Sequence, residues 1–212
     1  MKTIGAETRK DEDSMNATEH NRIIPTAFLV AAALFVVSSC ASVQTKVECS
    51  RTIDGKGMKS ASELAAFFMS QNPAADKAKV QRLAKYYVQE GSAEKINSDI
   101  AWVQMCHETG FLRFGGLVTE DMNNFCGLGA IDENNRGERF ETEQLGVRAH
   151  IQHLHAYGTT EDRTLKHELV DRRYRYVQPR GKAPTVFDLS GTWAANSEYG
   201  YQLDSLLVRL EG

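Results

Sequence analysis

The chain has 212 residues, a formal net charge of −3 and a pI near 6.1, and charged residues make up 25% of it. This balance leaves no basic stripe, so we expect no nucleic-acid partner. Once a leader is removed, the length allows one domain with a single buried core.

The N-terminal segment has the pattern of a bacterial lipoprotein signal. An apolar run at residues 23–37 follows Arg22 and leads into Val-Ser-Ser-Cys, which ends at Cys40. This pattern predicts a signal peptide at residues 1–39 and Cys40 as the lipidated residue. A transmembrane anchor is the alternative, but the run is shorter than the roughly 20 residues that a spanning helix needs. The segment before it is long and acidic, so Met15 is a second candidate for the start.

The expected location of the mature chain is the outer membrane, facing the periplasm. Ala41 and Ser42 follow Cys40 at the second and third mature positions, and neither is the aspartate that is associated at the second position with retention in the inner membrane. Residues 40–58 lack clear periodicity, and we interpret them as a tether between lipid and domain. Residues 59–212 are the predicted domain, which we expect to be a monomer.

Most of the predicted domain has helical periodicity. Ser60 and Glu63 form a capping-box motif at the start of a helix whose apolar face carries Leu64, Phe67 and Phe68. A second apolar stripe ends at Gly91 and consists of Val80, Leu83, Ala84, Tyr87 and Val88. Two later helices are indicated by Val147, Ile151 and Leu154, and by Tyr199, Leu203, Leu206 and Leu210.

The turn residues Asn-Asn-Arg-Gly at 134–137 predict a short β-hairpin among these helices. The expected fold is therefore mainly α, of the α+β class. A small β-lobe should flank a cleft on the helical domain.

A helix that ends beside Glu108 is the strongest functional signal in the chain. Asn97 or the serine after it can cap the start, and Gly110 can take the left-handed position after the end. Ala101, Met105 and Glu108 share one face, so the carboxylate should lie against apolar side chains. Poor hydration and the negative end of the helix dipole both raise a carboxyl pKa, as a general acid requires. The alternative is a partly exposed glutamate without a catalytic role.

The segment from Asn123 to Ala130 reads Asn-Asn-Phe-Cys-Gly-Leu-Gly-Ala. Glycine allows the backbone to approach a ligand closely, and Asn124 offers both donors and acceptors. Phe125 has an apolar face of the kind that packs against sugar rings. We therefore interpret this segment as one wall of a glycan cleft.

Together these motifs resemble the glucosaminidase domain of glycoside hydrolase family 73, in the lysozyme-like superfamily. The order is Glu-Thr-Gly from Glu108 on a helix, Asn-Asn-Phe-x-Gly-Leu-Gly, a segment centred on Phe140, and a helix opening at Gly146. The resemblance covers about residues 95–212 and continues in the segment from Trp193 to Gly200, before the last helix.

The resemblance implies a peptidoglycan hydrolase that needs no cofactor and cleaves the glycan strand after N-acetylglucosamine. It makes Glu108 the acid that protonates the leaving oxygen, with Tyr199 as the second catalytic residue. The expected substrate-binding residues are Asn123, Asn124, Phe125 and Trp193. The expected partners are therefore peptidoglycan glycan strands and, through the lipid on Cys40, a membrane.

The second carboxylate is left open by the sequence. The family often has another acidic residue on the β-lobe, and the candidates are Asp132, Glu133, Glu138 and Glu141. Carboxylate separations of about 5–5.5 Å in retaining and about 6.5–9.5 Å in inverting enzymes cannot be read from a sequence. A route in which the substrate's own 2-acetamido group attacks needs Glu108 alone.

Other functions also stay open. A lytic transglycosylase works from one helix glutamate too, but that glutamate is usually followed by serine rather than by Thr109. A muramidase would cleave the other glycosidic bond. An inactive glycan-binding lipoprotein would keep Asn124 and Phe125 without turnover, and a purely structural envelope lipoprotein would bind no peptidoglycan.

The remaining cysteines and histidines allow two further hypotheses. Cys106 and Cys126 either pair as a brace or are small buried side chains. A cluster on one predicted helix consists of His150, His153 and His155. No zincin motif and no Asp or Cys at ligand spacing accompanies this cluster, so we expect no metal site.

Overall fold

The computed structural model describes residues 48–212. The predicted signal peptide at residues 1–39, the lipidated Cys40 and the candidate start Met15 lie outside the described residues. Within the described part of the chain, no helix combines the length and the apolar character needed to cross a membrane.

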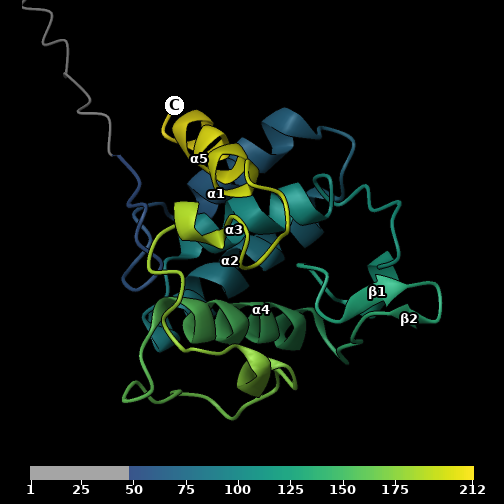
Figure 1. Cartoon of the computed structure of the whole chain (residues 1–212). Helices are drawn as coiled ribbons and strands as arrows, with labels where there is room; N and C mark the ends of the chain where they lie inside the picture. Colours follow the sequence, from purple (N-terminus) through teal and green to yellow (C-terminus); the bar gives the residue numbers. More distant parts are fainter. Residues whose placement is uncertain (1–47) are drawn as a thin grey trace, which may run out of the picture. The chain divides into compact units, whose positions relative to one another are not determined.

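The described residues form a helical domain with one small antiparallel hairpin (Figure 1). Its helices are α1 (Ala61–Gln71), α2 (Lys77–Glu94), α3 (Ser98–Glu108), α4 (Glu143–Gly158) and α5 (Tyr199–Leu210). Its short 3-10 turns are η1 (Glu120–Met122), η2 (Tyr174–Tyr176) and η3 (Phe187–Leu189). Its strands are β1 (Ala130–Asp132) and β2 (Asn135–Arg136). The predicted α+β, lysozyme-like architecture is confirmed.

Helix α3 lies at the centre of the domain, where α1, α2, α4 and α5 all contact it. Every residue from Ser98 to Cys106 is buried, so the helix packs on all sides rather than along one stripe. The Trp102 ring lies 5.8 Å from the Phe68 ring and 5.5 Å from the Tyr87 ring, centroid to centroid. Because core packing is dense, these neighbours fix the position of α3.

Local capping signals correctly predicted the helix starts of α1 and α3. Ser60 and Glu63 form the capping box of α1. The Asn97 side chain accepts hydrogen bonds from the N–H groups of Asp99 and Ile100 in the first turn of α3.

The predicted end of α2 at Gly91 was wrong. The helix continues to Glu94, and Lys95 takes the left-handed position after it, with φ +56°. A Cβ on Gly91 would lie 2.8 Å from the backbone oxygen of Ile96. The glycine therefore allows a close packing contact inside the helix and does not end it.

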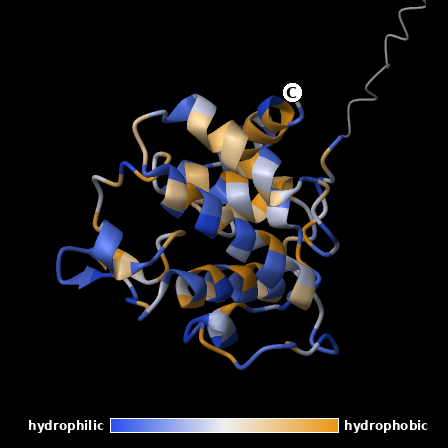
Figure 2. Cartoon of the chain, turned by 180° about the vertical axis from the view of Figure 1, so that it is seen from behind, coloured by the Kyte–Doolittle hydropathy of each residue, from blue (hydrophilic) through white to orange (hydrophobic). Residues whose placement is uncertain are grey.

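The hairpin lies to one side of the helices, in the segment between α3 and α4 (Figure 1), and is largely hydrophilic (Figure 2). Its turn begins at Glu133, one residue earlier than predicted. The Asp132 carboxylate closes this turn, because it accepts hydrogen bonds from the N–H groups of Asn134 and Asn135, each at 2.9 Å.

Residues 48–58, which belong to the predicted tether, pack against the helical domain. Cys49 and Ile53 are buried. The Asp99 carboxylate at the start of α3 accepts a hydrogen bond from the Met58 N–H at 2.6 Å. The division of the chain at residues 39 and 58 stays a prediction.

Candidate active site

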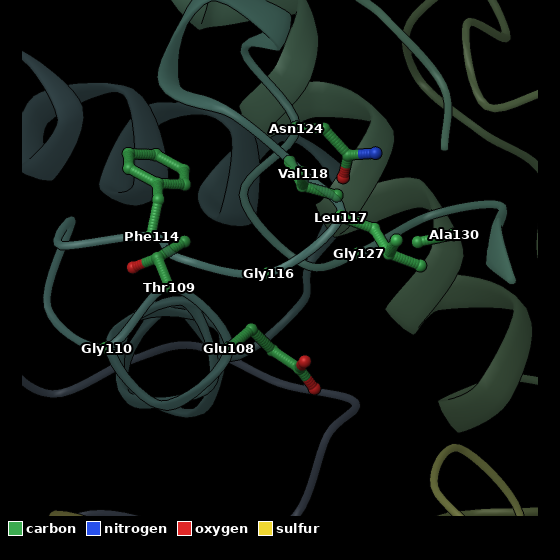
Figure 3. A pocket seen from close by; sticks show the side chains of 10 residues that line it. All are labelled: Glu108, Thr109, Gly110, Phe114, Gly116, Leu117, Val118, Asn124, Gly127 and Ala130. Carbon is green, nitrogen blue, oxygen red and sulfur yellow. The ribbon is translucent and has the colours of Figure 1, made fainter. Parts of the chain in front are cut away.

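Glu108 is the last residue of α3, and its side chain projects from the helix end into a surface pocket (Figure 3). Thr109 caps the helix and Gly110 follows with φ +57°, which confirms the predicted helix end. One wall of the pocket is the loop from Phe114 to Val118, and the other comes from the segment Asn124–Ala130.

The two oxygens of the Glu108 carboxylate have different surroundings. The Tyr199 hydroxyl, at the start of α5, donates to Oε1. The indole N–H of Trp193 donates to the same oxygen at 3.2 Å. The other oxygen, Oε2, lies 3.9 Å from the place that a Cβ on the pocket residue Gly127 would occupy. Oε1 is therefore held by the protein, while Oε2 faces the pocket.

The pKa of Glu108 is raised above its usual value, mainly because the surrounding protein removes water from the carboxylate. Hydrogen bonds from Tyr199 and Trp193 and the neighbouring His107 oppose this effect without outweighing it. The side chain still has solvent access. The predicted direction of the shift is thus confirmed for a carboxyl group that can both hold a proton and reach a ligand.

The loop after α3 has a strained backbone. Gly110, Phe111 and Leu112 have successive φ angles of +57°, +57° and +58°, which L-residues rarely adopt in a row. Two hydrogen bonds hold this turn: the Leu112 N–H donates to Thr109 Oγ1 at 2.9 Å, and the Phe111 N–H donates to the Cys106 carbonyl at 2.7 Å. Strain of this kind concentrates at functional sites.

Asn124 shapes the opposite wall of the pocket. Its amide donates to the carbonyls of Leu128 and Glu138 at 2.9 and 3.0 Å, and its oxygen accepts from the Leu128 N–H at 3.0 Å. Asn124 lines the pocket as predicted. Its polar atoms, however, are engaged within the loop, so they hold the wall in place.

Asn123 and Phe125 lie away from the predicted sugar-binding surface. The Asn123 amide donates to the Phe140 carbonyl at 3.0 Å, and Phe125 is completely buried in the core. A Cβ on Gly146 of α4 would lie 1.8 Å from the backbone carbonyl oxygen of Asn123 and 3.3 Å from the Phe125 ring. The close approach that glycine permits is therefore between helix and loop, and the Phe125 ring has no free face for a sugar.

Trp193 lies beside Glu108 and packs against aromatic side chains of α4. The centroids of His153 and Tyr157 lie 5.1 and 5.2 Å from its ring. His153 is itself fixed by a 2.7 Å hydrogen bond with Asp171. The packing directs the indole N–H toward Glu108 and leaves part of the indole exposed.

Two site residues, Gln104 and His150, were not predicted. The Gln104 amide donates to Tyr199 Oη at 2.8 Å, and its oxygen lies 2.9 Å from His150 Nε2. Both side chains are completely buried. Gln104 precedes Glu108 by four residues on α3, so helical spacing was the available signal.

The three histidines of α4, together with Cys106 and Cys126, are buried in the core. Hydrogen-bonded pairs join His150 with Tyr87, His153 with Asp171, and His155 with Tyr174. Among residues 48–212, no three His, Cys, Asp or Glu side chains are arranged to hold a metal ion. Cys106 and Cys126 are free and buried, so of the two alternatives the one without a disulfide applies.

The candidates for a second carboxylate differ in their surroundings. Asp132 is engaged in the hairpin turn, and a Glu138 oxygen lies 4.0 Å from the Arg172 guanidinium. Glu133 lines a hollow that shares part of the loop after α3 with the pocket of Glu108. Glu141 is exposed and lines neither of these two hollows.

A helical domain with a small β-lobe and a glutamate at the end of its central helix has the architecture of a lysozyme-like α+β domain. The glucosaminidase family, described as mannosyl-glycoprotein endo-β-N-acetylglucosaminidase, matches residues 84–211, which is more than half of the chain. The chain belongs to this family and is a peptidoglycan-related glycosidase. A Borreliella burgdorferi protein, described as an uncharacterized protein, is 38% identical over 155 residues, which cover 73% of this chain and 74% of the relative.

The variant Tyr199→Phe should move the alkaline limb of the pH–rate profile to higher pH. The hydroxyl stabilises the ionised carboxylate, so its loss raises the pKa of Glu108 further and the acid keeps its proton longer. The measurement is kcat/KM for glycan cleavage across pH. Tyr201→Phe, at an exposed tyrosine of α5, is the matched control. An unmoved or acid-shifted limb in Tyr199→Phe would contradict the prediction.

Proposed function

We propose that the protein is an endo-β-N-acetylglucosaminidase that cleaves peptidoglycan glycan strands with Glu108 as general acid. The supporting observation is the asymmetric carboxylate, in which Oε1 accepts two hydrogen bonds and Oε2 faces the pocket. A proton resides on the oxygen that is not already accepting, which here is Oε2. From Oε2 it passes to the glycosidic oxygen as the bond to the sugar breaks.

In this mechanism Tyr199 and Trp193 act on both states of the acid. Before proton transfer they orient the carboxyl group, and afterwards they donate to the carboxylate that remains. The partly exposed indole of Trp193 also offers a face to a sugar ring at the edge of the pocket. We assign Trp193 the stacking role that Phe125 cannot fill.

An inactive glycan-binding protein is the second candidate, because within residues 48–212 Glu108 is the one carboxylate that lines its pocket. A lytic transglycosylase or a muramidase would use the same acid. These three alternatives differ from the proposal in the products they leave, so product analysis separates all of them.

Purified sacculi incubated with protein from residue 41 onward should yield new reducing ends at N-acetylglucosamine, as measured by mass spectrometry. Glu108→Gln should lower the rate of cleavage at least by the factor of about 10²–10⁴ that is attributed to general acid–base catalysis. The matched control Glu141→Gln should leave the rate unchanged. Equal rates in wild type and Glu108→Gln would refute the proposed acid. Reducing ends at N-acetylmuramic acid would identify a muramidase, anhydro products a transglycosylase, and binding without products an inactive protein.

We further propose Glu133 as the second carboxylate. It is the one candidate of the four whose hollow adjoins the pocket of Glu108. It lies in the hairpin turn between β1 and β2, where its side chain is exposed.

Glu133→Gln should therefore lower kcat by about 10²–10⁴-fold, the range for a positioned acid or base. Rates on sacculi are compared with those of Glu141→Gln, which alters an exposed glutamate outside both hollows. NMR detection of the first anomer released gives the stereochemical outcome. Wild-type turnover by Glu133→Gln would replace this proposal with attack by the substrate's 2-acetamido group, which needs Glu108 alone.

We also propose that a lipid on Cys40 anchors the protein in the outer membrane, facing the periplasm. The apolar run and the Val-Ser-Ser-Cys motif support this proposal. The intact mass of protein purified from membranes should correspond to a chain that begins at Cys40 and carries a diacylglyceryl group. Cys40→Ser should remain uncleaved and unmodified. A wild-type protein with an unmodified Cys40 would contradict the anchor.

A further inference from the structure

A chain of buried hydrogen bonds extends from the site into the core behind Tyr199. Gln104 Nε2 donates to Tyr199 Oη at 2.8 Å, and Gln104 Oε1 lies 2.9 Å from His150 Nε2. His150 Nδ1 in turn lies 2.9 Å from the Tyr87 hydroxyl. Gln104, His150 and Tyr87 are inaccessible to solvent, and Tyr199 is 3% exposed. Four polar side chains from α2, α3, α4 and α5 thus meet in an apolar interior.

In this hydrogen-bond chain the donors run in one direction, from Tyr87 toward Glu108. Burial lowers the pKa of His150 to about 3, so the ring is neutral and carries one N–H. If Nε2 carries that hydrogen, it donates to Gln104 Oε1, and Nδ1 accepts from the Tyr87 hydroxyl. The Gln104 amide then donates to Tyr199 Oη, which leaves the Tyr199 hydrogen directed at Glu108.

The opposite direction would disable the site. If His150 carried its hydrogen on Nδ1, Gln104 would have to turn its amide toward the ring and its oxygen toward Tyr199. The Tyr199 hydroxyl would then donate to Gln104 instead of Glu108. The buried Tyr87 hydroxyl would lose the acceptor it has in the described structure, which is costly in an apolar interior.

We propose that Gln104 and His150 are positioning residues that, with Tyr87 as the terminal donor, keep the Tyr199 hydroxyl donating to Glu108. Their hydrogen bonds reach the Glu108 carboxyl group through the Tyr199 hydroxyl, and the His150 ring also packs beside Trp193, with the ring centroids 5.9 Å apart. The importance of this hydrogen-bond chain for turnover rests on the proposed acid role of Glu108. The effect of the hydrogen-bond chain on the pKa of Glu108 is independent of that proposal, because it exists in the protein without substrate.

The test is a carbon-13 NMR titration of the Glu108 carboxyl in protein labelled at glutamate side-chain carboxyls, with Glu108→Gln identifying the resonance. Gln104→Met removes the donor and acceptor at similar volume. It should raise the pKa of Glu108, as Tyr199→Phe does, because a released hydroxyl no longer always donates to the carboxylate. The double variant should show no shift beyond that of Tyr199→Phe alone.

A second variant covers the case in which Gln104→Met does not fold. Tyr87→Phe removes only the terminal hydroxyl and should raise the pKa of Glu108 by less than Tyr199→Phe. Its matched control is Tyr174→Phe, which removes a hydroxyl 2.9 Å from His155 Nδ1, a similar pair outside the chain. This control should leave the titration of Glu108 unchanged.

The results separate the positioning role from the proposed function. The positioning role is overturned if Tyr199→Phe moves the pKa of Glu108 while Gln104→Met and Tyr87→Phe do not, or if the shifts of Gln104→Met and Tyr199→Phe add in the double variant. If the variants shift the pKa of Glu108 as expected but the protein leaves sacculi intact, the positioning role is supported and the proposed hydrolase is refuted. Cleavage of sacculi with no pKa coupling to Gln104 would do the reverse.

Discussion

The burial of α3 on every side is the constraint on which the site depends. Four helices contact α3, and every residue from Ser98 to Cys106 is buried. Glu108 is therefore a carboxylate at the point where a rigid central helix reaches the surface. Its backbone is fixed by the core, and the helix C-terminus adds partial negative charge, which further favours the protonated acid. A glutamate on a peripheral loop would have neither the fixed position nor this electrostatic environment.

The choice of hydrogen-bond donors then determines what kind of acid Glu108 is. A lysine or arginine at Oε1 would orient the carboxylate equally well, but its charge would lower the pKa strongly. Tyr199 and Trp193 orient it as neutral groups, and desolvation still prevails. Burial raises the pKa of Tyr199 well above its usual range, and the adjacent carboxylate adds to this effect, so the hydroxyl remains a donor. The carboxyl group is thus oriented while its pKa stays above the usual value.

The sequence predicted those features that depend on neighbouring residues and missed those that depend on distant ones. The caps at Ser60 and Asn97 and the helix end at Gly110 follow from local hydrogen bonding and backbone preference, and they were predicted correctly. Gly91 and Phe125 were interpreted from local rules as a helix end and a sugar platform. Both instead serve contacts with backbone or helices that only the folded chain brings near.

The same reasoning explains why the position of Glu108 at a helix end was predictable from the residues, whereas the contacts that hold its carboxylate were not. The position of Glu108 on α3 is a matter of helical spacing, whereas Gln104 and Tyr199 are separated by 95 residues and meet only after α3 and α5 pack. These long-range contacts hold Oε1 of Glu108, which accepts hydrogen bonds from Tyr199 and Trp193. The other oxygen faces Gly127, which has no side chain to fill the pocket. The fold therefore holds the Glu108 carboxyl group through one oxygen and leaves the other facing the pocket.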